Sequence, residues 1–484
     1  MACGHDHADV IVVGAGSAGG AAAARLTEDP GCSVLLLEAG PDFPNEFENP
    51  PAFLTGGTQL GHNFAGTGAP TPDTDWDYWS PPLVNGRRVH HKRAKLVGGS
   101  SMINGSIAVR AAPPDFERWQ EHGAPAWGWE EVLPYIERVE SITPIKRHRR
   151  EHFSPIARTF AESFEEVGYR WVDDMNDTKA WNGVVGQWPQ NRRNEVRQGT
   201  LVTYVRAARP RPNFEIRGSC LTDRVLIDGD RAVGVRYLDE SGEAREVFAD
   251  EVLLSGGAYG SPAILLRSGI GPADELQALG IGVIASLPVG RGLMEHPQCF
   301  FYLYGPPELA EMTLPGWPVA ARGEGDGWWS FPLALDEEAG HCAYSFALAE
   351  DARDGRLTLV SADPVEAPRI DHRLQDVIES DRFDHAWDTF VQLSETAAVR
   401  KRGATSPDLE RPLREILQER MGTAFHPVGG CQIGRVVDDN LRVYGVEGLR
   451  IADASVFPIH ILNNPNLTCM MVGERAADLI AGAR

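Results

Sequence analysis

The chain has 484 residues, of which 42% are hydrophobic and 24% charged, and its formal net charge is −22. This composition is typical of a globular protein long enough for two or more domains. The strong negative charge argues against nucleic acid or an anionic membrane surface as a partner. The longest apolar runs fall short of the roughly 18 residues of a membrane span. The N-terminus also lacks a basic segment followed by a cleavage site, so we expect a cytoplasmic protein.

The seven cysteines are scattered, odd in number and never spaced as CxxC. This pattern predicts reduced thiols and argues against a disulfide framework or a zinc site. We therefore expect no metal in the functional site.

The beginning of the chain reads as a strand, a glycine turn and a helix. The apolar run from Val10 to Val13 predicts a buried parallel strand. Gly14, Gly16 and Gly19 then form G-x-G-x-x-G, whose glycines permit the tight turn, the approach of a pyrophosphate and close packing of helix and strand. Glu38 ends the next strand, 24 residues after Gly14, where an acidic side chain takes a ribose hydroxyl. A dinucleotide site is predicted, and these residues alone leave NAD and FAD both open.

The middle of the chain alternates between irregular and regular segments. Residues 41–93 are rich in Pro, Gly, Asp and Trp and predict a long excursion, which is usually functional when it is ordered. Residues 113–195 are helical and amphipathic in parts, and residues 213–257 read as short strands joined by tight turns. We then expect a helix with Ser261 as its N-cap and Gly269 as its stop.

Five sequence blocks resemble the signatures of the glucose-methanol-choline (GMC) flavin oxidoreductases. "RAKLVGGSSMING" (93–105) resembles the first signature of this family, and "GAYGSPAILLRSGIGP" (257–272) resembles the second. "FHPVGGCQIG", "LRIADASVFP" and "NNPNLTCMMVGERAADLI" resemble its C-terminal blocks, and the tail is most similar to that of choline oxidases. The region from about 298 to 350 is poorly matched.

The resemblance implies an α/β fold with two domains. A discontinuous, Rossmann-like FAD-binding domain is expected from residues 1–112, 196–297 and 422–484. A second, α+β substrate domain containing an antiparallel sheet is expected from residues 113–195 and 298–421.

The resemblance also implies FAD as the cofactor and a set of residues that surround it. These cofactor-binding residues are Gly14, Gly16, Ser17, Gly19, Glu38, Gly98, Gly99, Ser101, Asn104, Val225, Asp453, Ala454, Pro465 and Asn466. For Asp453 a helix or turn cap is the structural alternative, and for Asn104 a turn residue. In choline oxidases a histidine of the first signature carries the flavin covalently. The matching residue here is Ile103, which cannot form that bond, so we predict non-covalent FAD.

Gln298 is the residue expected to contact the substrate. In choline oxidases a glutamate two residues after the histidine of the "EHPQ" element helps to hold the choline cation. The neutral amide of Gln298 at the matching position loses the charge–charge attraction to a quaternary ammonium. Choline is therefore a doubtful substrate, although aromatic residues can still attract a cation to their ring faces.

Oxidation of an alcohol needs a group that accepts the hydroxyl proton, and a histidine, with an unperturbed pKa of about 6.5, suits that task. The resemblance makes His426 this acid/base and Asn466 the residue that hydrogen-bonds the substrate oxygen. The alternative for His426 is a buried histidine bonded to backbone. A helix after Asn466 would direct free N–H groups and its positive dipole end at the flavin.

The function implied is the oxidation of a small-molecule alcohol to an aldehyde or ketone by hydride transfer to flavin N5, with oxygen or another carrier as the electron acceptor. Three alternatives stay open: a hydroxynitrile lyase-like FAD enzyme, a non-catalytic flavin protein, and a mycofactocin-linked dehydrogenase that uses an acceptor other than oxygen. The identity of the alcohol does not follow from the sequence, because the poorly matched segment would line its pocket.

Overall fold

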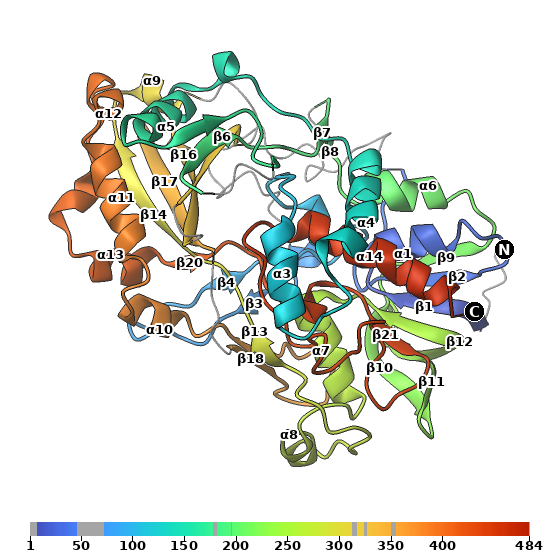
Figure 1. Cartoon of the computed structure of the whole chain (residues 1–484). Helices are drawn as coiled ribbons and strands as arrows, with labels where there is room; N and C mark the ends of the chain where they lie inside the picture. The colour runs from blue at the N-terminus through green and yellow to red at the C-terminus, as the bar shows by residue number, and fades with distance from the viewer. Residues whose placement is uncertain are drawn as a thin grey trace.

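The computed structural model describes residues 7–45, 72–177, 182–194, 196–311, 317–323, 327–349 and 355–483. Much of the predicted excursion, residues 46–71, therefore lies outside the described residues. The described chain forms two lobes, each built around one large sheet (Figure 1). The N-terminal strands and the C-terminal helix share one lobe, which explains how distant sequence segments meet.

The first sheet combines a parallel core with an antiparallel edge. Its strands are β1 (His7–Val13), β2 (Val34–Leu37), β9 (Phe214–Arg217), β10 (Leu221–Asp228), β11 (Arg231–Leu238), β12 (Ala244–Leu254) and β21 (Leu449–Ile451). Their order is β10-β11-β12-β1-β2-β9, with β21 also pairing with β12. Strand β1 is parallel to both β2 and β12, whereas β10, β11 and β12 are antiparallel. The buried run from Val10 to Val13 is the predicted central strand.

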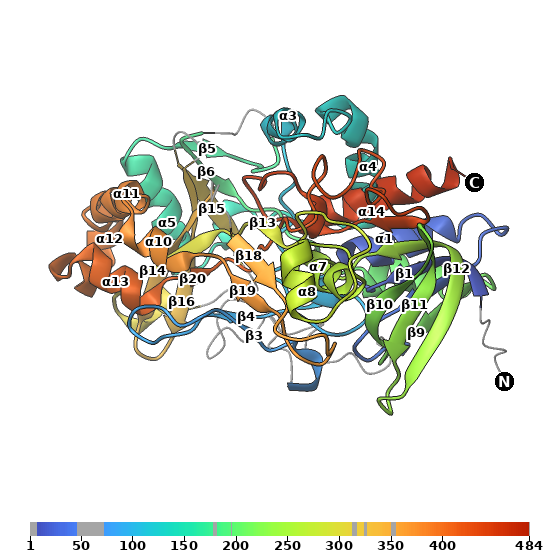
Figure 2. The ribbon, with the colours of Figure 1, turned by 90° about the horizontal axis from the view of Figure 1, so that it is seen from below.

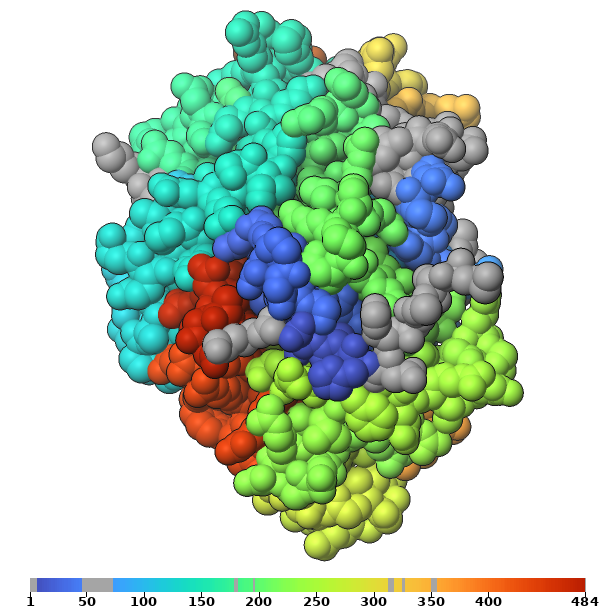
Figure 3. Space-filling model, turned by 90° about the vertical axis from the view of Figure 1, so that its right-hand side faces the viewer, coloured from blue at the N-terminus to red at the C-terminus, as the bar shows by residue number. Residues whose placement is uncertain are grey.

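Two helices from opposite ends of the chain cover this sheet together. Helix α1 (Ser17–Leu26) is made almost entirely of small buried residues, and α14 (Asn466–Ala481) packs along it. The approach is close enough that a Cβ atom on Gly473 would lie 2.2 Å from the carbonyl oxygen of Ala18. Figure 3 shows the N-terminal segment in blue beside the C-terminal segment in red on this face of the molecule.

The second sheet is antiparallel except at one edge. Its strands, in spatial order, are β20 (Gly422–Thr423), β14 (Pro297–Tyr304), β17 (His341–Leu348), β16 (Trp328–Asp336), β15 (Val319–Arg322), β6 (Val184–Gln187) and β5 (Arg170–Val172). Residues 422–423, expected with the FAD segments, pair with β14 in this sheet. A strand of only two residues has no recognisable sequence pattern, so the boundary between the two domains could not be placed here from the sequence.

The two faces of the second sheet have different neighbours because side chains alternate along a strand. On one face, Phe301 and Trp328 pack with the helices that cover the sheet. On the other face, the adjacent residues Phe300 and Trp329 belong to a separate aromatic cluster. That cluster faces the interior of the molecule, toward the first lobe.

The remaining described helices are α3 (Pro113–Glu121), α4 (Trp129–Ile142), α5 (Pro155–Glu166), α6 (Arg206–Ala208), α7 (Gly257–Arg267), α8 (Ala273–Ala278), α9 (Pro307–Ala310), α10 (Leu374–Glu379), α11 (Asp384–Ser394), α12 (Ala397–Lys401) and α13 (Leu413–Arg420). The remaining strands are β3 (Tyr78–Trp79), β4 (His90–His91), β7 (Arg192–Arg193), β8 (Val196–Arg197), β13 (Arg291–Leu293), β18 (Gly355–Thr358) and β19 (Arg369–Asp371). The pairs β3–β4 and β18–β19 lie between the two lobes (Figures 1 and 2). Within the described residues, no helix is both long and apolar enough to cross a membrane.

Helix α7 begins earlier than expected, so Ser261 is not its N-cap. The helix starts at Gly257, and Ser261 lies inside it. The Ser261 hydroxyl instead accepts a hydrogen bond of 2.9 Å from the Gly256 N–H and donates one of 2.6 Å to Asp453. Capping preferences could not reveal this, because the serine serves a partner almost two hundred residues away. Gly269 does follow the end of the helix, with φ of +82°.

Candidate active site

A large cavity lies where the two lobes meet. It holds about 2050 Å³ of empty space, including its opening to solvent. Its walls come from both ends of the chain and from the inner face of the antiparallel sheet. Within the described residues, no group of three or more His, Cys, Asp and Glu side chains is placed to hold a metal ion.

The glycine turn after β1 lines one end of the cavity. Gly14 has φ of +96°, and a Cβ atom on it would lie 2.5 Å from the carbonyl oxygen of Ser255. Gly98 and Gly99 form a second glycine cluster, and Gly99 packs directly against the turn, since a Cβ atom there would lie 2.8 Å from Cα of Gly16. Helix α1 starts after Gly16, which has no side chain to cap it, so its first N–H groups can receive a phosphate. The turn therefore fits the pyrophosphate of FAD.

Four of the predicted cofactor residues do not line the cavity. A Cβ atom on Gly19 would lie 2.0 Å from the Gly14 carbonyl oxygen, so this glycine serves helix packing. The Ser101 hydroxyl donates to the Gly98 carbonyl at 2.6 Å, and both residues shape the loop that presents Gly99 and Ser100 to the cavity. The fourth residue, Val225, was expected at the cofactor, but the residues of its segment that line the cavity come earlier in the chain.

Val225 is buried, and its N–H donates to the Ser268 hydroxyl at 2.9 Å. The residues of this segment that reach the cavity are Cys220, Leu221 and Thr222 at the start of β10. Which residues of a strand meet a ligand depends on where the strand begins relative to its neighbours. The sequence pattern shows the strand but not that position.

Glu38 lines the cavity and is almost completely buried. Its carboxylate accepts hydrogen bonds from the Ala15 N–H at 2.9 Å and the Gly40 N–H at 3.0 Å. Burial raises its pKa to about 7, against the lowering effect of these hydrogen bonds. The side chain thus joins the two βα segments next to the glycine turn, where a ribose hydroxyl is expected.

Asp453 and Asn104 line the cavity. Each also has the structural role that was its alternative, a helix cap for Asp453 and a turn residue for Asn104. The Asp453 carboxylate accepts from the Gly257 N–H at 2.8 Å and from the Ser455 N–H at 2.8 Å, and it caps the short helix Ala454–Val456. Asn104 accepts from the Ser106 N–H at 2.9 Å. Ala454, Pro465 and Ser17 also line the cavity.

His426 lies in the loop after β20, and hydrogen bonds hold its backbone at both ends. Its N–H donates to Glu295 at 2.7 Å, and its carbonyl oxygen lies 2.7 Å from Nε2 of His460. The residue lines the cavity and is mostly buried. Burial, then the charges of His460 and Arg93, lower its pKa well below the usual 6.5. The imidazole is therefore neutral near pH 7 and has a free lone pair.

The asparagine beside His426 is Asn464, not the predicted Asn466. Nδ2 of Asn464 lies 3.1 Å from Nε2 of His426. Asn466 instead accepts a hydrogen bond of 2.8 Å from the Ser17 hydroxyl, and its Nδ2 has no hydrogen-bond partner among the described residues. The sequence "NNPN" offers several candidates, and only the backbone conformation around Pro465 decides which one meets the histidine. The residue before a proline is disfavoured in a helix, and that is the signal that could have identified Asn464.

Helix α14 begins at Asn466, after Pro465, and its first turn lines the cavity through Asn466 and Cys469. The side chain of Pro465 has no hydrogen-bonding atom that could cap the helix. The N-terminal N–H groups and the positive dipole end of α14 therefore lie at the cavity, as the sequence predicts. The unpartnered amide of Asn466 is a donor at this place, which fits a ligand rich in acceptors.

Aromatic side chains form the opposite wall of the cavity. Trp317 and Trp188 pack against Phe331 with ring centroids 4.8 and 5.1 Å away. Trp329 lies 5.8 Å from the ring of His426. Gln298 lines the same cavity as predicted, and its Nε2 donates to Ser345 at 2.6 Å. Sequence reasoning missed these aromatic residues, of which Trp317, Trp329 and Phe331 belong to the segment that matches the family least.

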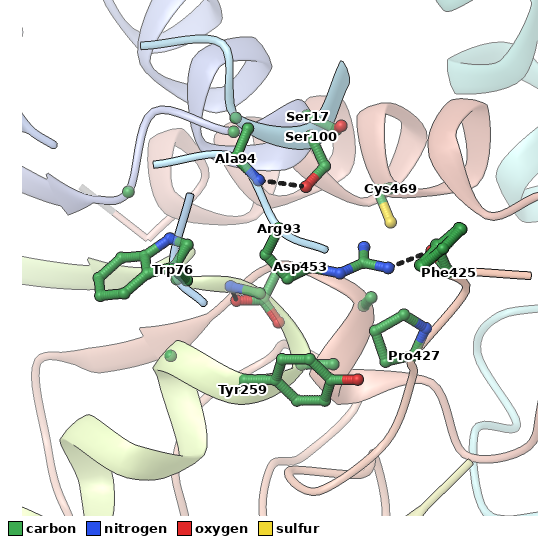
Figure 4. A pocket seen from close by; sticks show the side chains of 18 of the residues that line it. Ser17, Trp76, Arg93, Ala94, Ser100, Tyr259, Phe425, Pro427, Asp453 and Cys469 are labelled. Atoms are coloured by element: carbon green, nitrogen blue, oxygen red, sulfur yellow. Dashed lines mark hydrogen bonds between the residues drawn. The ribbon is translucent and has the colours of Figure 1, made fainter. Parts of the chain in front are cut away.

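Arg93 also lines the cavity, and sequence reasoning missed it. Its guanidinium group extends into the middle of the cavity and donates to the carbonyl oxygen of Phe425 (Figure 4). Phe425, next to His426, has φ of +63°, an uncommon conformation for a bulky residue and one often found at functional sites. Arg93 opens the first GMC-like signature, and its place in that block was the available signal.

Comparisons with known proteins agree with this geometry. Two family models of the GMC oxidoreductases match residues 8–298 and 351–473. The chain is 31% identical to the oxygen-dependent choline dehydrogenase of Sinorhizobium medicae, covering 98% of this chain and 96% of that one. It is 33% identical to the enzyme of the same name from Pseudomonas putida, covering 98% and 94%.

Solved structures show the same fold. The formate oxidase of Aspergillus oryzae superimposes with a TM-score of 0.87 at 22% identity, covering 99% of both chains. The pyridoxine 4-oxidase of Mesorbium loti superimposes with a TM-score of 0.85 at 25% identity, covering 97% of this chain and 98% of that one. The lyase alternative gains no support from these relatives. The chain belongs to the GMC oxidoreductase family, and is an FAD-dependent oxidoreductase that acts on CH–OH groups.

Proposed function

We propose that His426 accepts the hydroxyl proton of the alcohol and that Asn464 orients its oxygen. The observation that carries this proposal is the 3.1 Å contact between Nδ2 of Asn464 and Nε2 of His426 on the wall of the cavity. One side chain offers a lone pair and the other an N–H group at the same point. An alcohol oxygen bound there replaces the amide–imidazole hydrogen bond, donating to Nε2 of the imidazole while it accepts from the amide.

Oxidation of the alcohol removes a hydride from the carbinol carbon and a proton from the hydroxyl group, leaving a carbonyl. FAD, when bound, supplies the acceptor for the hydride. His426 takes the proton on Nε2, because its lowered pKa keeps the ring neutral before the reaction. The amide of Asn464 limits the directions in which the oxygen can point, and so fixes which hydrogen of the carbinol carbon is exposed.

The wall opposite the glycine turn supports an uncharged substrate with an apolar or aromatic body. Trp188, Trp317, Trp329 and Phe331 present ring surfaces, and Gln298 beside them is neutral. The choline dehydrogenase relatives are named for a cationic alcohol. Without a charge at Gln298, a quaternary ammonium would depend on ring faces alone, which contribute less than an added ion pair.

An anaerobic substrate panel tests both parts of the proposal. The FAD-loaded enzyme is mixed with an aryl alcohol, a linear alkyl alcohol or choline, and the flavin absorbance is followed. We expect rapid bleaching with the aryl alcohol and slower bleaching with choline. Absence of bleaching with every alcohol would refute the assigned chemistry, whereas fastest bleaching with choline would refute only the substrate class. Mixing the bleached enzyme with oxygen then tells an oxidase from a dehydrogenase.

Three further expectations stay proposals. FAD is held without a covalent bond, because Ile103 is an isoleucine that lies buried beside the second glycine cluster. The FAD domain comprises residues 1–112, 196–297 and 422–484, although 422–423 pair with β14, and residues 113–195 and 298–421 form the substrate domain. The protein works in the cytoplasm.

A further inference from the structure

The ring of His426 is one of three histidine rings in contact, and the other two belong to His296 and His460. We propose that His296 is a positioning residue that keeps the proton of His426 on Nδ1, so that the lone pair of Nε2 faces the substrate. The inference deepens the proposed function and depends on the role of His426 given there. The donor atom of each hydrogen bond around these rings fixes this tautomer.

The first step concerns His296 itself. Its Nε2 lies 3.0 Å from the carbonyl oxygen of Ile461, and a carbonyl oxygen can only accept a hydrogen bond. Nε2 of His296 therefore carries a proton. The ring is completely buried, and this burial keeps its pKa well below 6.5, so it carries only one proton near neutral pH. Nδ1 of His296 is left with a lone pair.

The second step passes this constraint to His426. The two Nδ1 atoms of His296 and His426 lie 3.0 Å apart, a distance at which one of them must donate. Because Nδ1 of His296 has a lone pair, Nδ1 of His426 carries the proton. A neutral imidazole has one N–H group, so Nε2 of His426 is bare. The amide N–H of Asn464 approaches that same Nε2 at 3.1 Å, which only a bare nitrogen can accept.

The third step is that the surroundings hold the two rings in this relation. One carboxylate oxygen of Glu295 accepts hydrogen bonds from the backbone N–H groups of both histidines, at 2.8 Å from His296 and at 2.7 Å from His426. The ring of His460 stacks on His296 with centroids 3.7 Å apart, and its Nε2 and Nδ1 lie 2.7 Å and 2.9 Å from the carbonyl oxygens of His426 and Ile461. The rings of His296 and His426 stand nearly perpendicular, at 85°. This arrangement directs the edge of one imidazole at the edge of the other.

The opposite tautomer would prevent the reaction. With its proton on Nε2, His426 would present an N–H group to the alcohol and to Asn464, and it could not accept the hydroxyl proton. In serine proteases, loss of the group that holds the catalytic histidine in its correct tautomer lowers kcat by about 10⁴-fold. His296 has the corresponding task here, although it is neutral and contributes no charge.

Variants of His296 in the FAD-loaded enzyme test the inference. His296→Leu removes the acceptor and should slow anaerobic flavin reduction by roughly 10²-fold or more. His296→Asn places an amide oxygen near the former Nδ1 and should stay within about tenfold of wild type. His148→Leu, which removes a buried histidine outside the cavity, controls for the loss of an imidazole and should leave the rate unchanged. A wild-type rate in His296→Leu would overturn the inference.

A direct measurement avoids any dependence on how the variants fold. The enzyme is prepared with ¹⁵N in its histidine rings, and the His426 signals are identified by their loss in His426→Gln. We expect Nδ1 to be protonated and Nε2 bare, and the opposite assignment would overturn the inference. If His426→Gln also left flavin reduction unaffected, the proposed function itself would fail, and the two failures are thus distinguishable.

Discussion

The amide of Asn464 donates to Nε2 of His426 over 3.1 Å, although 38 residues separate them in the chain. Their meeting depends on the loop after β20 and on the segment before α14 reaching the same wall of the cavity. Asn466, two residues further on, instead contacts Ser17, the first residue of α1 after the glycine turn. The two asparagines therefore have separable tasks, and substitutions can show this.

Asn464→Ala is expected to lower the rate constant of flavin reduction by about 10–10²-fold, because the alcohol oxygen loses one of its two orienting partners. Asn466→Ala removes the acceptor of the Ser17 hydroxyl and should weaken FAD binding with less effect on that rate constant. Single-turnover kinetics and flavin titration of the apoprotein separate these effects. The assignment is reversed if Asn466→Ala gives the larger kinetic defect.

Replacement of His426 by alanine should reduce the rate constant of flavin reduction by about 10²–10⁴-fold, because the proton acceptor is lost. FAD should remain bound, since the glycine turn and Glu38 are untouched. The flavin spectrum after desalting checks the second point. Unchanged reduction in a variant that retains its flavin would remove His426 from the chemistry.

Acid should destabilise the fold through its buried histidines. Burial lowers the pKa of His91 to about 3 and that of His460 to about 4, and it lowers the pKa values of His296 and His372 strongly as well. The unfolded chain binds these protons near pH 6.5, before the folded protein does, so stability is complete above that pH and falls as the pH drops below it. The buried carboxyl groups of Glu38 and Asp115, with pKa values raised to about 7 and about 6, offset part of this loss.

Urea unfolding followed between pH 7 and pH 5 measures the balance. Each group contributes a slope of up to about 1.4 kcal/mol per pH unit. Five buried histidines, with His426 included, stand against four buried carboxyl groups whose pKa values are raised, Glu38, Asp115, Asp453 and Glu474, so a small net loss is expected. Stability that rises on acidification in this range would contradict the expectation.

Gln298→Glu should lower the KM of choline relative to that of an aryl alcohol, because a carboxylate in the cavity attracts the cation. Gln298→Met, neutral and of similar length, is the matched control and should not shift the ratio in favour of choline. Steady-state kinetics with both substrates gives the comparison. An unaltered ratio in Gln298→Glu would place the cation site elsewhere in the cavity.

Acid precipitation of the holoenzyme should release all of its FAD into the supernatant, because Ile103 offers no nucleophile for attachment. The yellow colour of the pellet and the supernatant, read by absorbance, is the measurement. Flavin that stays with the precipitated protein after unfolding would show a covalent bond to another residue.

Local signals predicted the parts of the site that local geometry controls. The glycine turn, Glu38 at the end of β2 and the α14 N-terminus at the cavity all depend on residues near one another in sequence. His426 was found through its surrounding block, because the family signature preserves that loop. These residues can be predicted from sequence because their backbone conformations restrict which amino acids can occupy the positions.

Other parts depend on tertiary contacts that no local pattern records. Val225 and Leu221 lie on the same strand, and only the start of β10 decides which of them meets the cavity. Asn464 and Asn466 have the same side chain, and the turn at Pro465 decides their directions. The approach of His296 to His426 joins separate segments through ring nitrogens, and no periodicity marks it.

The packing of α14 on α1, where Gly473 approaches the Ala18 carbonyl, has a consequence for biosynthesis. The central sheet gains β21 and the helix α14 only from residues 449–481, so a nascent chain that lacks them can pair β1 with β2 and β12 but leaves α1 without the helix that packs along it. The nucleotide fold therefore closes after translation has passed those residues, and until then the apolar surface of α1 stays available to chaperones.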